Sequence, residues 1–227
     1  MTTTDGSADM RFNTILVDPP WHYRSSGQNG NAKSQYATLT TDELCALPVG
    51  ELGTDESVLL LWSTSPHLPD ALRVIDAWRY QYVTDLPWIK AALHDLAKVK
   101  FGVGGWGRGV MEHVLVAKRK RSYRTQWTML IAPGMSHSRK PDSIYEYAES
   151  FPGPRVELFA RRPWPGWYAL GNELPGDGQD IRDSLPRHID GSEPWVRATD
   201  LVRSAGFEPE KRDLSTRSGT SAEAVFP

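Results

Sequence analysis

The feature that most constrains the fold is an apolar stretch that runs directly into an acid and two prolines. Residues 15–17 (Ile-Leu-Val) are predicted to form a strand buried on both faces, and Asp18-Pro19-Pro20-Trp21 follows at once. Strands buried on both faces belong to parallel sheets covered by helices, and a proline cannot donate to the ladder, so this strand ends at Asp18. The sequence therefore predicts an α/β fold with a carboxylate at the carboxyl end of a strand, where such sheets bind ligands.

This corner suits chemistry on an amino group attached to an aromatic base. Such an amine is a poor nucleophile because its lone pair is delocalised into the ring, so a catalyst must accept its N–H hydrogens. The Asp18 carboxylate is one acceptor. The carbonyl of Pro19 is a second, because we expect the turn to push it outward with no amide hydrogen to occupy it. Trp21 would offer a flat face to the base, and such stacking contributes about 1–3 kcal/mol. A turn whose Trp21 is buried in the core would carry the same residues, so a purely structural interpretation stays open.

The rest of the chain alternates strands with helices. A capping box of Thr40 and Glu43 predicts a helix that ends near Pro48, and further helices are expected after Pro66 and from Pro141. This alternation predicts parallel strands. The expected strands cover residues 57–62, 82–90, 111–117, 126–132, 155–160 and 167–170. We expect one domain over residues 1–174 and a partly disordered tail over residues 175–227 with a single short helix that ends at Gly206.

Positive charge is concentrated in one segment of a chain whose formal net charge is −2. Residues 88–141 contain eleven Lys or Arg side chains and only two acids. A basic segment on an otherwise acidic protein indicates a polyanion at one face, although a solvated charged hairpin would have the same composition. The turn that contains Lys118, Arg119, Lys120 and Arg121 is the predicted phosphate contact, with Arg108 on a neighbouring glycine-rich loop.

Other classes of site find little support. Cys45 is the only cysteine, which excludes an internal disulfide and a thiolate-rich zinc site, and no two of the six histidines have close ligand spacing, so we expect no metal. No signal peptide or membrane span is predicted, which indicates a soluble cytoplasmic protein. Gly102, Gly104 and Gly107 form a G-x-G-x-x-G pattern, but no apolar strand precedes them and a strand follows them, which argues against a dinucleotide-dependent oxidoreductase.

Several landmarks occur together in an order that resembles one known family. They are Asp18-Pro19-Pro20-Trp21 after an apolar strand, Tyr36 before a capped helix, the strand 59–62, Trp88-Ile89-Lys90, Glu112-His113, the segment 137–142, the strand 157–161 and Leu170-Gly171-Asn172-Glu173. Over residues 12–174 the chain is similar to the S-adenosylmethionine-dependent N6-adenine methyltransferases that carry a DPPW motif. The resemblance implies a Rossmann-like, mostly parallel methyltransferase sheet in a permuted order, with the catalytic motif first and the cofactor strand last.

The resemblance also implies roles for individual residues. Asp18, Pro19, Pro20 and Trp21 would be catalytic, with Asp18 also beside the cofactor. S-adenosylmethionine would be bound through its carboxylate by Lys140, through its ribose by Arg161, and through its adenine by Asn172 and Glu173. Trp88 and Glu112 would line the substrate site. The residues themselves, apart from the resemblance, suggest that the substrate would also meet Tyr36, Arg108 and Lys118 to Arg121. The chain departs from the family pattern at Pro163-Trp164, where a His-Asn pair is expected near the ribose, and at Glu173, which replaces an amide.

The predicted activity is methylation of the N6 amino group of adenine in nucleic acid. We favour DNA over RNA because the chain is small and resembles no single-strand RNA-binding module. A homodimer or a heterodimer is compatible with this activity. The alternative is a catalytically silent member of the family that binds nucleic acid or a partner subunit.

Overall fold

The computed structural model describes residues 10–22, 38–92, 95–101, 108–121, 123, 129–134, 139–175 and 178–206. Its strands are β1 (Phe12–Val17), β2 (Gly53–Ser63), β3 (Gln81–Ala92), β4 (Asp95–Val99), β5 (Met111–Lys118), β6 (Leu130–Pro133), β7 (Arg155–Leu158) and β8 (Tyr168–Leu170). Its helices are α1 (Thr41–Ala46), α2 (Leu68–Ala77), α3 (Ser143–Glu149), α4 (Ile181–Ile189) and α5 (Ala198–Ser204), with 3-10 turns η1 (Pro48–Glu51) and η2 (Ser65–His67).

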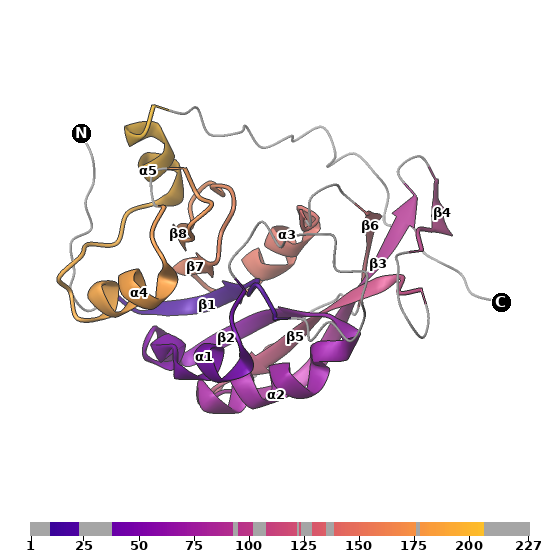
Figure 1. Ribbon diagram of the computed structural model, residues 1–227, viewed down its shortest axis with the longest axis horizontal. Coiled ribbons are helices and arrows are strands. Elements are labelled where there is room, and N and C mark those ends of the chain that lie inside the picture. Colours follow the sequence, from indigo (N-terminus) through magenta and orange to yellow (C-terminus); the bar gives the residue numbers. More distant parts are fainter. Residues whose placement is uncertain are drawn as a thin grey trace, which may run out of the picture.

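The strands form one sheet in the order β4-β3-β5-β2-β1-β7-β8, and β6 pairs with β3 (Figure 1). β1 is parallel to β2 and to β7, β7 is parallel to β8, and β3 is parallel to β6. β5 runs antiparallel between β2 and β3, so β2 and β3 point the same way. The first strand of the chain therefore lies inside the sheet with the late strands beyond it, which confirms the mostly parallel, permuted arrangement.

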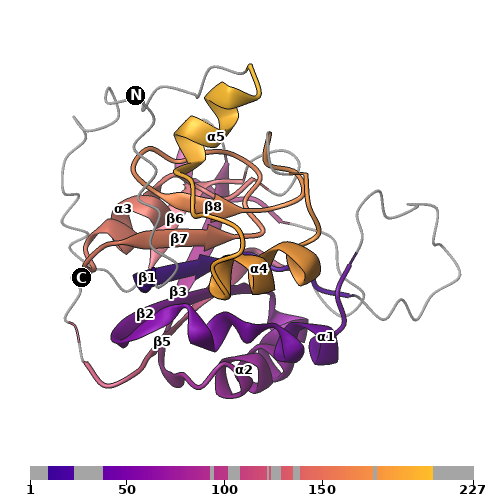
Figure 2. The same cartoon turned by 90° about the vertical axis from the view of Figure 1, so that its left-hand side faces the viewer.

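Both faces of the sheet are covered. On one face, Ile15 and Val17 pack in a cluster with residues of α1, α2 and α4. On the other face, Leu16 and Trp62 pack with Ile144 and other residues of α3. Figure 2 shows α1 and α2 on one side of the strands and α3 on the other. Asp18 lies two residues after Leu16 and therefore follows the face that α3 covers, because side chains alternate along a strand.

Local signals read from the sequence reappear in the structure. Thr40 caps α1, and its side chain and that of Glu43 form the reciprocal bonds of a capping box. Pro87 lies in β3 at a point where only β5 is paired with it, since pairing with β6 begins at Trp88. Proline is tolerated there because its missing N–H faces no neighbouring strand.

The segment after residue 174 contains two helices where the sequence predicted one. α4 was missed because Pro186 lies inside it, and a proline in a periodic segment normally argues against a helix. Ile181 and Leu185 of α4 join the core cluster of the sheet, and the Trp195 ring lies 4.8 Å from that of Phe12. α5 was predicted, and it packs through Ala198 and Val202 against the ends of β7 and β8. Within the described residues, no helix has the length and apolar character needed to cross a bilayer.

Candidate active site

The site is organised around Asp18, the first residue after β1. Val17 pairs with Leu61 of β2 and with Leu158 of β7, so Asp18 emerges between the carboxyl ends of two parallel neighbours. Its side chain is 16% exposed, which leaves the carboxylate within reach of a ligand. This is the place at which open α/β sheets bind ligands, as the sequence indicated.

A chain of alternating charges connects Asp18 to the far strands of the sheet. Lys140, just before α3, lies 3.0 Å from the Asp18 carboxylate and 3.2 Å from that of Glu112 in β5. Glu112 in turn lies 2.5 Å from the ammonium group of Lys90 in β3. Lys140 also lies over the Trp62 ring, 5.1 Å from its centroid. The two acids and two lysines therefore hold one another in place at the end of the sheet where Asp18 follows β1.

The pKa values in this chain show which charges the surroundings support. Burial disfavours the charged form of Lys140, but the carboxylates of Asp18 and Glu112 outweigh it and raise the pKa of Lys140. Burial likewise disfavours the Glu112 carboxylate, yet the ammonium groups of Lys140 and Lys90 lower the pKa of Glu112 below its usual value. Lys140 and Glu112 are therefore both charged at neutral pH.

Two features of the Asp-Pro-Pro-Trp corner differ from the sequence-based description. The Pro19 carbonyl was expected to carry no amide partner, but it accepts the Trp21 N–H at 2.9 Å across Pro20, which closes a three-residue turn. One lone pair of that carbonyl remains for a ligand. Trp21 was expected to present an open face, yet it is 7% exposed, bonds the Trp62 carbonyl through Nε1 at 3.0 Å, and is stacked on His67. Trp21 thus packs as part of the core.

The residues assigned to the cofactor lie beyond Asp18 on the side of β7 and β8. Arg161 and Glu173 meet through an ion pair of 3.4 Å, and Asn172 beside them is exposed. Gly171 lies so close to the neighbouring turn that a Cβ there would come within 2.2 Å of the Ala160 carbonyl oxygen. The ends of β7 and β8 therefore approach each other closely, and the structure brings Arg161, Asn172 and Glu173 together there.

The departure at Pro163-Trp164 has a structural explanation. Trp164 turns inward, where its ring stacks on that of Tyr145 at a centroid distance of 4.1 Å. Its Nε1 donates to a carboxylate oxygen of Glu149 at 3.0 Å. Arg162 lies over both rings and forms an ion pair of 2.5 Å with Asp142. Trp164 is therefore used for packing and does not take the place of the ribose-binding pair.

The residues assigned to the substrate fall into separate groups. Glu112 belongs to the charge chain, whereas Trp88 is 2% exposed and lies in the core beneath Lys90. Arg108 lies over the exposed ring of Phe101, which follows β4. Tyr36 and the glycine pattern at residues 102–107 lie outside the described residues.

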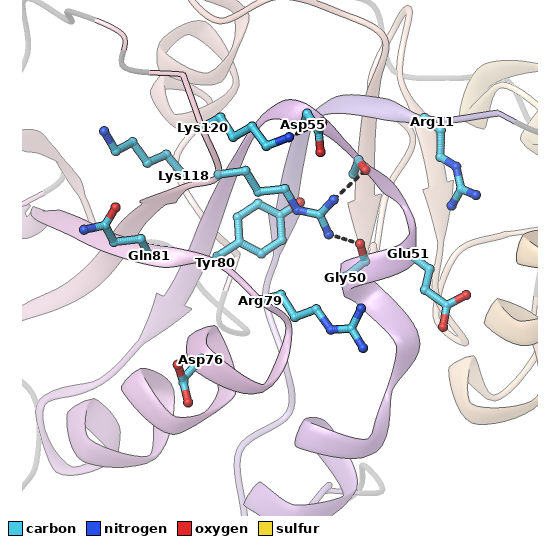
Figure 3. A pocket seen from close by; sticks show the side chains of 12 residues that line it. Arg11, Gly50, Glu51, Asp55, Asp76, Arg79, Tyr80, Gln81, Lys118 and Lys120 are labelled. Carbon is cyan, nitrogen blue, oxygen red and sulfur yellow. Dashed lines mark hydrogen bonds and ion pairs between the residues drawn. The ribbon is translucent and has the colours of Figure 1, made fainter.

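The basic turn after β5 does not meet the rest of the site. Lys118 pairs with Val58 of β2 and with Gln81, the first residue of β3, and the next residues meet Asp55 and Glu56 near the start of β2, so Lys118 to Arg121 lie at the end of the sheet opposite Asp18. Arg119 donates to the carbonyls of Gly50 and Gly53 and covers the Tyr80 ring. Figure 3 shows Gly50 and Tyr80 in this region, with Lys120 beside Asp55. Lys120 and Arg121 form ion pairs with Asp55 and Glu56. This turn lines an open pocket of about 710 Å³ that is separate from the charge chain.

Two residues near Asp18 received no role in the sequence analysis. Lys90 faces Glu112 because Trp88 and Glu112 are opposite each other across β3 and β5; the cross-strand spacing becomes visible only once this pairing is known. Glu157 of β7 is paired with Leu16 and accepts the Tyr145 hydroxyl at 2.9 Å. Burial raises the pKa of Glu157 to about 7, against the effects of the Tyr145 hydroxyl and Arg162.

Comparison with known proteins gives a consistent result. The MT-A70 family model matches residues 12–173. The chain is 31% identical over 176 residues to the N(6)-adenosine-methyltransferase catalytic subunit METTL3 of Homo sapiens, which covers 73% of this chain and 29% of METTL3. It is 26% identical over 196 residues to the type II methyltransferase M.MunI of a Mycoplasma species, covering 75% and 81% of the two chains. It is 29% identical over 182 residues to the N6-methyladenosine RNA methyltransferase MTA1 of Pyricularia oryzae, covering 72% and 47%.

Proposed function

The chain belongs to the MT-A70 family, and from that premise we propose that it transfers a methyl group from S-adenosylmethionine to the N6 amino group of adenine in a nucleic acid. The methyltransferases of this family use S-adenosylmethionine as methyl donor. The chain spans less than a third of METTL3, so the proposal rests on the site itself as well as on the relationship. The observation that carries it is the partly exposed Asp18 carboxylate at the carboxyl end of β1, held by Lys140.

The chemistry of the neighbouring side chains fits the cofactor. Lys140 has three ammonium hydrogens, of which two suffice for Asp18 and Glu112, so it can also serve the carboxylate of the cofactor. The Arg161–Glu173 pair offers both a donor and acceptors for hydroxyl groups. Gly171 lets the ends of β7 and β8 approach closely, because the backbone of Ala160 occupies the space that a Cβ would take, and this approach brings Arg161 near Glu173. When bound there, S-adenosylmethionine supplies an electrophilic methyl group.

The role of Asp18 is to hold the acceptor amine. Its carboxylate accepts an N–H hydrogen of the exocyclic amine, and the free lone pair of the Pro19 carbonyl accepts the other. Both bonds localise the nitrogen lone pair and direct it away from the ring. Methyl transfer needs alignment and polarisation of the amine more than a strong base, so positioned acceptors supply much of the rate enhancement.

The acceptor is proposed to be DNA in preference to RNA. Support comes from the sequence, which carries no motif of an RNA-recognition sheet or KH loop. Binding of a nucleic acid of either kind is supported by what we call the β4 arm, namely β4 with Lys100 and Phe101. The Lys100 N–H donates to the Lys90 carbonyl at 2.7 Å, so the arm lies beside the charge chain. Lys98 and Lys100 offer cations to the phosphates of a nucleic acid, and the exposed Phe101 offers a ring to its bases.

The test is methyl transfer from labelled S-adenosylmethionine to double-stranded DNA, single-stranded DNA and RNA of matched sequence, followed by digestion to nucleosides. We expect label in N6-methyladenine, and most of it from double-stranded DNA. Label mainly in RNA would replace DNA as the substrate and leave the chemistry unchanged.

The matched variant is Asp18→Ala, with binding of S-adenosylmethionine measured by calorimetry. We expect loss of turnover with cofactor binding largely retained. Turnover equal to the wild type would remove Asp18 from the mechanism. A wild-type chain that binds the cofactor but methylates none of the three polymers would support the alternative, a silent member of the family.

A further inference from the structure

A partly buried line of hydrogen bonds lies on the other face of the sheet from the charge chain. Asp85 of β3 meets His113 of β5, with 2.7 Å between the Asp85 carboxylate and His113 Nδ1. On the other side of the same ring, His113 Nε2 lies 3.1 Å from the hydroxyl of Ser65. His113 is 8% exposed, whereas Ser65 is exposed. Because a carboxylate only accepts, Nδ1 carries a hydrogen, and in the neutral ring Nε2 then accepts the Ser65 hydroxyl.

The line ends at the turn that supports the catalytic corner. Ser65 is the first residue of η2 and His67 is the last, and the His67 N–H closes the turn on the Thr64 carbonyl at 2.8 Å. The His67 ring is stacked on Trp21, with centroids 5.3 Å apart and planes inclined by 15°. The Trp21 ring is therefore held on one face by His67 and at its edge by the Trp62 carbonyl. Trp21 in turn donates its backbone N–H to Pro19, next to Asp18.

We propose that the Asp85–His113–Ser65 line is a positioning device that sets η2 against Trp21 and thereby fixes the orientation of the Asp18-Pro19-Pro20 turn. The three residues are positioning residues, since they act through His67 and Trp21 and lie on the opposite face from Lys140. A rigid turn keeps the carboxylate and the Pro19 carbonyl in register with the acceptor amine, and a misplacement of about 1 Å can cost a hundredfold in rate. The proposal rests on the function proposed for Asp18.

Asp85 contacts the His113 ring through only one of its two carboxylate oxygens. The second oxygen of Asp85, Oδ1, is buried and has no hydrogen-bond partner among the residues that the structure describes. An unsatisfied buried carboxylate oxygen is costly, so this oxygen adds nothing to stability. The contribution of Asp85 that the geometry shows is made by its other oxygen, which orients the His113 ring and through it Ser65.

The test uses two readouts on the full chain. The first is the indole Nε1–H resonance of Trp21 in nitrogen-15 spectra, assigned with Trp21→Phe. The second is kcat for methyl transfer, together with the dissociation constant for S-adenosylmethionine. The variants are Ser65→Ala, Ser65→Thr and His113→Gln. The control is Tyr80→Phe, which breaks a buried hydroxyl contact of 2.8 Å with Ser57 at the opposite edge of the sheet.

We expect Ser65→Ala and His113→Gln to shift the Trp21 resonance and to lower kcat about tenfold without changing cofactor affinity. Ser65→Thr keeps the hydroxyl and should restore both readouts, and Tyr80→Phe should move neither. An unmoved Trp21 resonance in Ser65→Ala would overturn the proposal. So would a kcat loss no larger than that of Tyr80→Phe. If the wild type methylates no polymer, the proposed function fails, and the Trp21 resonance alone decides whether the line sets the turn.

Discussion

Lys140 Nζ lies 3.0 Å from Asp18 Oδ1, so the residue expected to hold the cofactor carboxylate directly touches the residue expected to hold the acceptor amine. Under the proposed function, one ammonium group orders both the cofactor and the acceptor. Replacement by Met removes the charge and keeps most of the side-chain volume. The carboxylates of Asp18 and Glu112 would then repel each other without compensation.

We therefore expect Lys140→Met to lower kcat/KM about a hundredfold, equivalent to about 2.7 kcal/mol, and to weaken binding of S-adenosylmethionine. Steady-state methylation and calorimetry measure the two effects. The matched control is Lys90→Met, which removes the outer lysine of the charge chain and should leave cofactor affinity unchanged. Equal affinity in Lys140→Met and the wild type would show that another group binds the carboxylate.

Glu157 should make the folded state less stable as the pH rises from about 5 to about 7. Burial raises its pKa from 4.5 to about 7, so the folded chain holds a proton that the unfolded chain has released. The stabilisation is present below pH 4.5, is lost progressively above it, and is gone above pH 7. The expected size is about 3 kcal/mol, since one pKa unit corresponds to about 1.4 kcal/mol.

Urea denaturation of the wild type and of Glu157→Gln at pH 5, 6, 7 and 8 measures this loss. The neutral amide cannot ionise, so the difference in unfolding free energy between the two proteins should change across this range. Parallel pH curves for the two proteins would mean that the pKa of Glu157 is not raised in the folded state.

Gly171→Ala should damage the cofactor end of the site. A Cβ would come within 2.2 Å of the Ala160 carbonyl oxygen and 2.6 Å of its nitrogen, so the ends of β7 and β8 would have to separate. We expect a loss of about 1–3 kcal/mol in unfolding free energy and weaker binding of S-adenosylmethionine, measured by thermal unfolding and calorimetry. Gly109→Ala is the control, because a Cβ there meets no atom within 4 Å.

Two pairs of lysines should differ in their effect on nucleic acid binding. Lys98 and Lys100 belong to the β4 arm beside the charge chain, whereas Lys118 and Lys120 lie at the opposite edge. We expect alanine substitution of the arm pair to lower the salt dependence of DNA affinity by about one to two phosphate contacts, and substitution of the other pair to change it little. Fluorescence anisotropy at several salt concentrations measures the slopes. If substitution of Lys118 and Lys120 lowered the slope instead, the turn after β5 would be the phosphate contact.

Much of the fold could be predicted from local patterns. The Asp-Pro-Pro corner, the capping box at Thr40 and the alternation of strands and helices are each determined by neighbouring residues. α4 was not predicted, since its Pro186 argues against a helix; Asp180 caps its start, and packing of Ile181 and Leu185 on the sheet stabilises it.

The site was predictable where one residue follows directly from a strand end, as Asp18 does. It was less predictable where residues meet across strands. Lys90 and Glu112 are neighbours only because β5 is inserted between β2 and β3. The basic turn at Lys118 suggested phosphate binding by its composition, but the reversed direction of β5 carries it to the other edge. Whether Trp21 is open or buried depends on His67, which no local pattern connects to it.

The reversed direction of β5 also bears on how such a protein can diversify. Because β5 runs antiparallel to β3, the connection between these two strands leaves and rejoins the sheet at the same end, beside Asp18. Connections at the ends of strands tolerate insertion and replacement better than central strands do, and the strand within this one, β4, is an edge strand that pairs with β3 alone. The segment between β3 and β5 is thus an exchangeable module. Changes in it would alter what lies beside Asp18, while Asp18, Lys140 and the ends of β7 and β8 stay in place.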